Sequence, residues 1–363
     1  MAGNRKNPMK TILITGGAGF VGSSIGLSIK QDEHDVRVIA FDNLIRKGSE
    51  MNLPRLKDAG VEFVRGDIRN PDDIASIWKF DIIYECAAEP SVLAGRDGNP
   101  SYVIQANLVG TLNCLEAARL CEATFVFLST SRVYPYGLLN NLDHEESDTR
   151  FVLTDANKIK GASSKGISEQ FDLSGVRSLY GATKLASELI IQEYCEMYGL
   201  KAIINRCGVL AGPWQMGKVD QGFVALWIAN HIYGLPLKYI GYEGKGKQVR
   251  DILHPADLYA LIKMQLKNIE KFSGQIFNVG GGLGNSVSLM EMTAISQDVS
   301  GRQISITQEL NDRPGDVRTY ITDCAKIQSL TGWSPTRSVK EIAEETANWM
   351  TDNKTLLQPV FCK

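Results

Sequence analysis

The sequence contains no run of about 18 consecutive apolar residues, the length that a membrane-spanning helix requires. Its first ten residues, MAGNRKNPMK, are polar and lack the apolar core of a secretory signal peptide. These two absences exclude the sequence patterns of membrane insertion and of secretion. We therefore expect a cytoplasmic protein that has no membrane partner.

An excess of charge of one sign is also missing. The 39 Lys and Arg residues nearly balance the 41 Asp and Glu residues, which gives a formal net charge of −2 and an isoelectric point near 6.2. A nucleic-acid-binding surface normally carries a basic excess. We therefore expect no nucleic-acid partner, and any anionic ligand has to be held by a few local groups.

Histidine is scarce and paired cysteines are missing. The four histidines show no metal-ligand spacing, and the seven cysteines are scattered, odd in number and without a CxxC pair. Free cysteine is among the most buried residue types in proteins. We therefore interpret the cysteines as reduced core residues and expect no metal ion.

Strand patterns alternate with helix patterns in the first half of the chain. Runs of strand length, rich in β-branched and aromatic residues, occupy residues 11–15, 36–41, 61–64, 80–85 and 124–129. A long helix is predicted over 182–199, and a strand over 201–206. This alternation predicts an α/β fold with a doubly wound, Rossmann-type parallel sheet that helices cover on both faces.

The pattern becomes shorter and less regular after about residue 212. We predict a dinucleotide-binding domain over 1–211 and a smaller mixed α/β lobe for the substrate, mainly over 212–363, with segments that return to the first domain. Residues 135–177 are rich in Asn, Asp, Gly and Ser and are too long for an ordinary connection. We expect this insertion to be a lid or another functional segment.

A glycine-rich turn follows the first predicted strand. In TGGAGFVG, Gly16, Gly19 and Gly22 are spaced as in turns that bring backbone N–H groups close to a pyrophosphate. A plain structural turn stays a possible interpretation. The next strand ends at Asp42, twenty residues past Gly22, where a carboxylate accepts ribose hydroxyls and repels a 2′-phosphate. The pattern favours NAD over NADP.

A second pattern, SLYGATK, places Tyr180 and Lys184 four residues apart, on one face of a helix. A nearby ammonium lowers the pKa of a phenol, which then takes a hydroxyl proton at neutral pH. Taken alone, this spacing is also common on helix surfaces. The hydroxyls of Ser129, Thr130 and Ser131, however, end a buried strand, at the edge where such sheets bind ligands.

Several motifs in this order resemble the extended short-chain dehydrogenase/reductase family, whose members act on nucleotide sugars. They are TGGAGFVG, FDNL, GDIRN, AAEPSV, NLVGTLNCLEAAR, STSRVY and YGATK. The resemblance covers almost the whole chain. It implies that Thr130 steadies the reacting sugar, that Tyr180 is the base, and that Lys184 binds the cofactor ribose and lowers the pKa of Tyr180.

The same resemblance implies a set of NAD contacts. Asp67 and Ile68 would flank the adenine, Ala87 and Ala88 would line the cofactor cleft, and Asn107 would brace the site. Together with the glycine turn and Asp42, these residues make up the expected cofactor-binding set. Its members are Gly16, Gly19, Phe20, Val21, Gly22, Asp42, Asn43, Asp67, Ile68, Ala87, Ala88, Asn107, Tyr180 and Lys184.

The second half is most similar to one subgroup of that family, the CDP-tyvelose 2-epimerases, also called CDP-paratose 2-epimerases. The similarity lies in GPWQMGKVDQG, GKGKQVRDILHPADL, NVGGGLGNSVSLMEM and RPGDVRTYITD. It implies that Arg250 and Arg313 clamp a sugar diphosphate, that Gln248 lies beside it, and that Asp316 contacts the nucleoside or orients Arg313. Guanidinium groups suit this task because they bind phosphate bidentately, although surface arginines are common.

The resemblance implies a reaction without net redox change. Tyr180 takes a hydroxyl proton while NAD accepts hydride from the same carbon, and the keto-sugar then receives the hydride on its other face. The substrate would be a CDP- or UDP-sugar. Dehydratases of the family carry Asp-Glu after the active-site threonine, and decarboxylases carry a glutamate at the position of Arg132. This chain has Ser131 and Arg132 there, which disfavours both reactions.

Some alternatives stay open. A UDP-hexose 4-epimerase would need only Thr130, Tyr180, Lys184 and NAD, and a non-catalytic NAD sensor or scaffold would need only the glycine turn and Asp42. Glu89 stands where relatives often have glutamine, so it is either an extra acid/base, a group that holds a sugar hydroxyl, or a partner of Arg132. With Ser131 and Arg132 it completes the expected substrate-binding set. By resemblance we also expect a homodimer.

Overall fold

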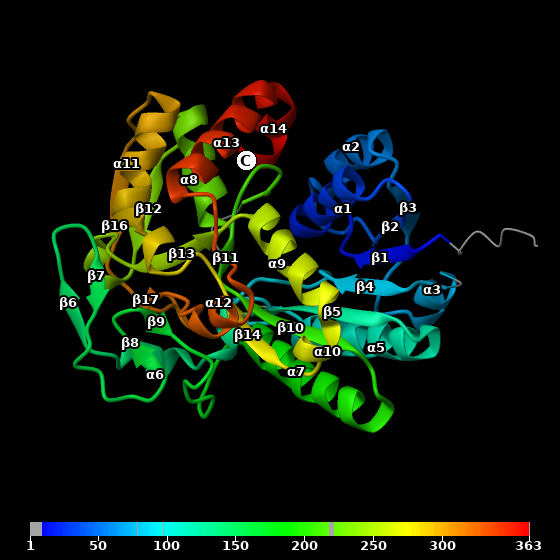
Figure 1. Ribbon diagram of the computed structural model, residues 1–363. Coiled ribbons are helices and arrows are strands. Elements are labelled where there is room, and N and C mark those ends of the chain that lie inside the picture. Colours follow the sequence, from blue (N-terminus) through cyan, green and yellow to red (C-terminus); the bar gives the residue numbers. More distant parts are fainter. Residues whose placement is uncertain (1–8, 78, 97, 218–220, 363) are drawn as a thin grey trace, which may run out of the picture.

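The protein is described by a computed structural model that covers residues 9–77, 79–96, 98–217 and 221–362. Figure 1 shows a lobe built on a large sheet beside a second lobe in which helices α8, α11, α13 and α14 gather. No helix in these ranges is long and apolar enough to cross a membrane.

The first lobe contains a parallel sheet of seven strands within the described residues, in the order β14-β10-β5-β4-β1-β2-β3. The chain winds outward in both directions from β1, which creates a switch point where such sheets bind ligands at the carboxyl ends of their strands. The strands are β1 (Thr11–Thr15), β2 (Arg37–Asp42), β3 (Glu62–Arg65), β4 (Ile82–Glu85), β5 (Thr124–Thr130), β10 (Ala202–Cys207) and β14 (Ile276–Val279).

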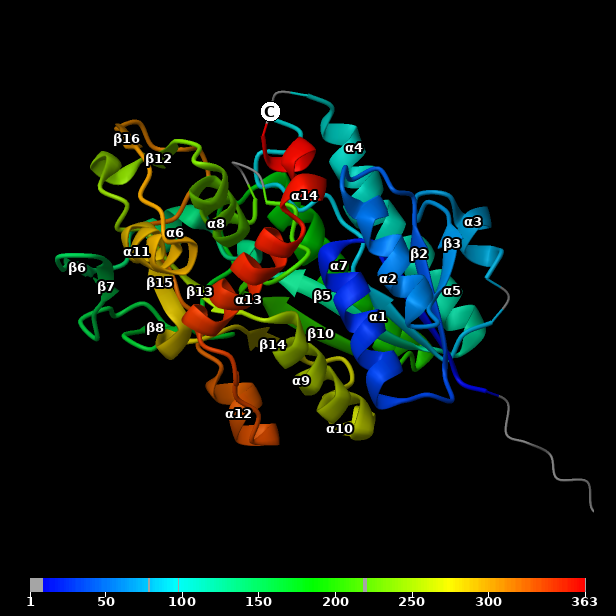
Figure 2. The same cartoon turned by 90° about the horizontal axis from the view of Figure 1, so that it is seen from above.

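Helices cover both faces of this sheet, as Figure 2 shows for α1 and α9 in front of the strands and α5 and α7 behind them. One face is packed by α1 (Phe20–Asp32), α2 (Leu53–Asp58), α9 (Pro255–Lys267), α10 (Ile269–Phe272) and α12 (Ala325–Thr331). The other is packed by α3 (Pro71–Ala75), α5 (Gly110–Cys121) and α7 (Leu179–Tyr198), and α4 (Pro100–Ile104) lies against α7. The predicted doubly wound α/β fold is confirmed.

The predicted strands of this sheet agree with the structure to within two residues at each end. The predicted helix over 182–199 begins three residues earlier, at Leu179, because the Ser178 side chain accepts a hydrogen bond from the Gly181 N–H and caps the helix. It ends at Tyr198, followed by Gly199 in the left-handed conformation with φ +68°. Tyr180 and Lys184 therefore both lie in the first two turns of α7.

The second lobe has its own apolar core, in which α8 (Phe223–Tyr233), α11 (Leu289–Ser300), α13 (Val339–Asp352) and α14 (Lys354–Phe361) contribute side chains. Its strands are β11 (Val209–Leu210), β12 (Leu237–Ile240), β13 (Val249–Leu253), β15 (Ser286–Ser288), β16 (Ile306–Glu309) and β17 (Thr319–Tyr320). Short single turns lie at η1 (Ser49–Asn52), η3 (Ser131–Val133), η4 (Tyr242–Gly244) and η5 (Leu283–Asn285). The domain boundary near residue 211 stays a prediction.

The insertion at 135–177 is more structured than its loop-like composition indicates. It forms α6 (Tyr136–Asn140), a hairpin of β6 (His144–Glu146) and β7 (Phe151–Leu153), and a hairpin of β8 (Ala162–Ser163) and β9 (Gly166–Ile167). Leu139, Leu153 and Phe171 pack in one apolar cluster with Val317 and Tyr320 of the later chain. These few anchors are spaced too irregularly to give a periodic pattern in the sequence.

Gly181 is the point where α7 meets the segment that follows β5. A Cβ atom at this position would lie 2.0 Å from the carbonyl oxygen of Arg132, far inside van der Waals contact. A Gly181→Ala substitution is therefore expected to push α7 away and to destabilise the fold by about 1–3 kcal/mol. Thermal or denaturant unfolding of the variant measures this loss.

Gly137 provides the matched control for this prediction. It also has an ordinary backbone conformation, but no atom outside its immediate surroundings lies within 4 Å of an added Cβ. Gly137→Ala should therefore not lower the unfolding free energy, and it should raise it by up to about 1 kcal/mol because alanine is the better helix former. Equal effects of the two substitutions would contradict the proposed close contact.

Candidate active site

A cavity of about 1060 Å³ lies at the carboxyl ends of the strands, between the two lobes. It is lined by every residue that the sequence analysis assigned to the cofactor, the chemistry or the substrate, with the exception of Asn107. A site for one small molecule typically measures roughly 300–1,000 Å³. This cavity is therefore large enough for a dinucleotide together with a second ligand.

The glycine turn forms the floor of one end of the cavity. Gly16 adopts φ +63°, and a Cβ atom there would lie 2.8 Å from the backbone nitrogen of Ala87, which follows β4. A Cβ atom at Gly22 would lie 2.3 Å from the carbonyl oxygen of Gly16. These contacts hold the N-terminus of α1, which begins at Phe20, against the cavity. The free N–H groups of a helix N-terminus favour a phosphate.

Asp42 lies at the end of β2, beside this helix terminus. Its carboxylate accepts hydrogen bonds from the N–H groups of Leu44 (2.8 Å) and Ala18 (3.1 Å). Burial raises the pKa of Asp42, and these backbone donors oppose the change. Each carboxylate oxygen has a second lone pair, so the side chain keeps acceptor capacity for ribose hydroxyls.

The neighbouring part of the wall is fixed by a second carboxylate. Asp67, after β3, forms an ion pair with Arg69 at 2.6 Å and accepts a hydrogen bond from the Asn43 side chain at 2.9 Å. The bonds from Arg69 lower the pKa of Asp67 to about 2. Asn43, Asp67 and Ile68 thus form an ordered wall of the cavity, where the sequence analysis expected an adenine.

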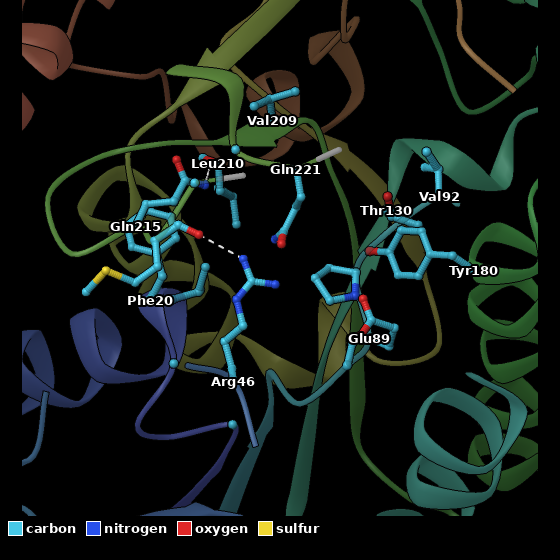
Figure 3. A pocket seen from close by; sticks show the side chains of 18 of the residues that line it. Phe20, Arg46, Glu89, Val92, Thr130, Tyr180, Val209, Leu210, Gln215 and Gln221 are labelled. Carbon is cyan, nitrogen blue, oxygen red and sulfur yellow. Dashed lines mark hydrogen bonds between the residues drawn. The ribbon is translucent and has the colours of Figure 1, made fainter. Parts of the chain in front are cut away.

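Arg46 and Lys47, two basic residues that follow Asp42, contact the second lobe. Arg46 donates a hydrogen bond from Nη2 to the carbonyl oxygen of Met216 at 2.8 Å, which Figure 3 shows as a dashed line. Lys47 donates from Nζ to the carbonyl oxygen of Pro359 at 3.0 Å. These two hydrogen bonds connect the loop after β2 with the second lobe.

Thr130 and Tyr180 come together at the centre of the cavity. Thr130 is the last residue of β5, Tyr180 lies in the first turn of α7, and their side chains face one another in Figure 3. Burial raises the pKa of the Tyr180 phenol, whereas the charge of Lys184 and a hydrogen bond with Thr130 lower it. This arrangement suits a phenol that exchanges a proton with a bound hydroxyl.

Lys184 is almost completely buried next to these groups. Its ammonium lies 3.2 Å from the Glu85 carboxylate and 4.2 Å from the centre of the Phe127 ring. The sequence analysis missed Glu85, because it placed this residue in an apolar strand pattern. A carboxylate in the middle of a buried parallel sheet was a usable signal, since such a group nearly always has a partner.

Asn107 lies behind the wall rather than in it. It belongs to a π-helical turn, η2 (Gln105–Val109), between α4 and α5. Its side chain accepts a hydrogen bond from the backbone N–H of Glu89 (2.8 Å) and donates one to the carbonyl oxygen of Glu89 (3.0 Å). Asn107 therefore braces the segment that carries Ala87, Ala88 and Glu89.

Glu89 points into the cavity near Tyr180 (Figure 3). One of its carboxylate oxygens accepts a hydrogen bond from the Ser91 N–H at 3.1 Å. The sequence analysis named Arg132 as one of its possible partners, but no ion pair joins these two side chains in the described part of the structure. Arg132 instead donates a hydrogen bond to the carbonyl oxygen of Gly315 at 3.2 Å.

The far end of the cavity is basic. Arg132, Arg250 and Arg313 line it together with Ser131, Gln248 and Asp316. Burial, together with the nearby charge of Arg250, lowers the pKa of Arg132 to about 10. Asp316 forms an ion pair with Arg250 at 2.7 Å, whereas the sequence analysis expected it to orient Arg313 or to contact a nucleoside. Such a cluster of guanidinium groups suits a diphosphate.

Gln248 is buried in the same region. It donates a hydrogen bond from Nε2 to the carbonyl oxygen of Ile240 at 2.7 Å, and its Oε1 atom is buried without a protein partner. An unsatisfied acceptor that lines a cavity is available to a ligand donor. In the described ranges no cluster of three His, Cys, Asp or Glu side chains could hold a metal ion.

The chain is similar to known proteins over nearly its whole length. It is 34% identical over 351 residues to CDP-paratose 2-epimerase of Salmonella typhi, a match that covers 93% of this chain and 98% of that one. The solved structure of a dTDP-glucose 4,6-dehydratase from Streptomyces venezuelae, which contains NAD, is 28% identical to this chain and has a TM-score of 0.76. The match covers 96% of this chain and 99% of that one.

A further solved structure is similar over nearly the same length. The UDP-glucose 4-epimerase of Thermus thermophilus, in complex with NAD, has a TM-score of 0.74 at 26% identity, and the match covers 94% of this chain and 99% of that one. Residues 12–280 match the model of the NAD dependent epimerase/dehydratase family. The protein therefore belongs to the NAD dependent epimerase/dehydratase family, and NAD is the cofactor that its glycine turn and Asp42 fit.

Proposed function

We propose that this protein is an NAD-dependent epimerase of a nucleotide diphosphate sugar. The observation that carries the proposal is the convergence of Thr130, Tyr180 and Lys184 in one cavity with the glycine turn and the arginine cluster. The cavity thus offers a dinucleotide cradle, a proton-exchanging phenol and a diphosphate site side by side. A sensor or scaffold protein would have no use for the last two.

When bound, NAD would supply the hydride chemistry by accepting hydride from a sugar carbon and returning it. The residues of the chain hold the sugar and transfer the proton. Thr130 holds the reacting hydroxyl, and Tyr180 takes its proton as the carbon is oxidised and gives it back as the carbon is reduced. Lys184 provides the positive charge that opposes the rise in the pKa of Tyr180 caused by burial. Inversion requires the keto-sugar to present its other face inside the cavity.

The substrate is anchored at its diphosphate. Arg250 and Arg313 lie where they can clamp two phosphate groups, and Arg132 adds a third guanidinium. The carboxylate of Asp316 holds Arg250 in place through their 2.7 Å ion pair. An anchor remote from the reacting carbon leaves the sugar ring free to turn between the two half-reactions.

Dehydration is less well supported, although dTDP-glucose 4,6-dehydratases are among the relatives. Elimination of water needs an acid/base pair next to the reacting carbons. In this chain Thr130 is followed by Ser131 and Arg132, neither of which is a carboxylic acid. The similarity to the Salmonella typhi enzyme supports a CDP-sugar as substrate and carbon 2 as the position of inversion.

We also propose that the protein forms a homodimer through α5 and α7. These helices lie side by side on one face of the sheet. Leu120 of α5 and Leu189, Met197 and Tyr198 of α7 are exposed large apolar side chains. Burial of such a surface against a second copy would remove it from water.

Replacement of the phenol tests the chemistry directly. In a Tyr180→Phe variant the proton acceptor is lost while the ring is kept, so turnover of the CDP-sugar should fall by about 100-fold or more. Tyr194→Phe on the same helix is the matched control, because the Tyr194 hydroxyl bonds to Glu116 outside the cavity. Unchanged turnover in Tyr180→Phe would remove the mechanism. Absence of turnover with both CDP- and UDP-sugars in the unaltered protein would favour the sensor.

A Lys184→Met variant tests the role of the ammonium through pH. Loss of this positive charge raises the pKa of Tyr180, so less phenolate is present at neutral pH and relatively more is recovered in alkali. The deficit in kcat relative to the unaltered protein should therefore shrink as the pH is raised from about 7 to about 10. Lys201→Met, which removes a surface cation, is the control. A deficit of constant size at every pH would contradict this role.

The internal return of hydride gives a labelling prediction. If the hydride that leaves the sugar carbon comes back to the same carbon, the product formed in D2O carries no solvent deuterium at the inverted position. Proton NMR of the CDP-sugar product measures this. Incorporation of deuterium there would indicate enolisation of a keto-sugar instead, a different reaction class.

A further inference from the structure

Glu85 is a buried carboxylate at the carboxyl end of β4, the middle strand of the sheet. It is the last residue of β4, between β1 and β5, and none of its surface is exposed. A charged group in such a place is strongly unfavourable unless it is paired. Burial raises the pKa of Glu85, and the charge of Lys184 opposes the change. The carboxylate therefore depends on its partner.

The contacts of Glu85 lead directly to the active site. Oε2 lies 3.2 Å from Nζ of Lys184, and Oε1 lies 3.3 Å from the hydroxyl of Thr111. Thr111 in turn donates a hydrogen bond to the carbonyl oxygen of Asn107 at 2.8 Å. The carboxylate thus connects the lysine of α7 with the π-helical turn that braces the cavity wall.

Lys184 faces Tyr180 on one side and Glu85 on another. The ammonium is 2% exposed and lies over the Phe127 ring, so little water is present to screen either charge. The other titratable groups near it are the thiols of Cys86, which follows β4, Cys114 on α5 and Cys207 on β10.

Burial raises the pKa of each of these three thiols, so they stay neutral in the working range. Two charged groups lie near the Tyr180 phenol itself: the guanidinium of Arg132, which follows β5, and the carboxylate of Glu89, which points into the cavity beside it (Figure 3). Among the described groups around Lys184, Glu85 is therefore the anion that offsets its charge.

We propose that Glu85 is a positioning residue that holds the ammonium of Lys184 and, by offsetting its charge, sets how readily Tyr180 releases and takes back its proton. The inference rests on the proposed function in one respect, that Tyr180 is the acid/base group. It adds a residue that touches neither the sugar nor the phenol and acts through Lys184.

An epimerase needs the charge of Lys184 to be offset, because its phenol both releases and takes back a proton in each turnover. In the first half-reaction the phenolate accepts the proton of the sugar hydroxyl, and in the second the phenol donates a proton to the oxygen of the reduced carbon, so no net proton is gained or lost. A lone buried ammonium would favour the phenolate throughout and hinder the second step. A neutral pair of ammonium and carboxylate lets the proton move both ways.

The test is a titration of the Tyr180 phenol in the full-length protein as purified. Tyrosine carrying 13C at Cζ reports phenol ionisation by NMR, and a Tyr180→Phe sample identifies the resonance. In Glu85→Gln, where the carboxylate charge is removed at nearly constant shape, the pKa of Tyr180 should fall by about one unit or more. The acid limb of the kcat profile should move to lower pH by the same amount.

Glu188→Gln is the matched control. Glu188 is also fully buried and lies on α7, the helix that carries Lys184. It forms an ion pair with Arg206 at 2.7 Å and accepts a hydrogen bond from Ser129. Its substitution should reduce thermal stability and leave the pKa of Tyr180 unchanged. Glu85→Asp keeps the charge but withdraws it by one methylene, so its titration should lie between those of the unaltered protein and Glu85→Gln.

An unchanged or raised pKa of Tyr180 in Glu85→Gln would overturn the proposal, as would the same shift in Glu188→Gln. If Glu85→Gln does not fold, the sign of the shift in Glu85→Asp decides. The titration requires no sugar, so a wrong substrate assignment leaves it intact. Unchanged turnover in Tyr180→Phe would instead remove the proposed function while the effect of Glu85 on the phenol could still be measured.

Discussion

Close contact between backbones at two glycines controls the geometry of this active site. Gly181 allows α7 to rest on the carbonyl oxygen of Arg132, and Gly16 allows the turn after β1 to rest on the backbone of Ala87. The first contact places Tyr180 beside Thr130, and the second places the N-terminus of α1 beside the same cavity. A side chain at either point would separate elements whose distances the chemistry depends on.

Charge inside the cavity is arranged in local pairs, in a protein whose total charge is close to zero. Lys184 faces Glu85, Arg250 faces Asp316, and Arg69 faces Asp67. Each pair fixes one side chain at the wall of the cavity. Among the described residues, the guanidinium groups of Arg132, Arg250 and Arg313 line the basic end, where a diphosphate with its two negative charges would be stabilised. Near the phenol, the charge of Lys184 is offset by Glu85, which would suit a proton that travels in both directions.

The sequence was sufficient for the parts of the structure that local patterns determine. Six strands of the parallel sheet were predicted to within two residues, because buried strands are rich in β-branched and aromatic residues, whereas β14 was not predicted. The spacing of Tyr180 and Lys184 placed both on one helix face. The missed contacts of the site involve partners far apart in the chain. Glu85 meets Lys184 across 99 residues, and Arg46 meets Met216 across 170. The hairpins of the insertion were missed because their strands are only two or three residues long.

The loop after β2 carries a further implication. Through Arg46 and Lys47 it is hydrogen-bonded to Met216 and Pro359, so the segment next to Asp42 is fastened to the second lobe and to the C-terminal helix. A dinucleotide bound against Asp42 would therefore lie beside a loop that two hydrogen bonds hold to the second lobe. Such a fastening would favour retention of the dinucleotide over many turnovers, which the proposed epimerase needs because its reaction has no net redox change.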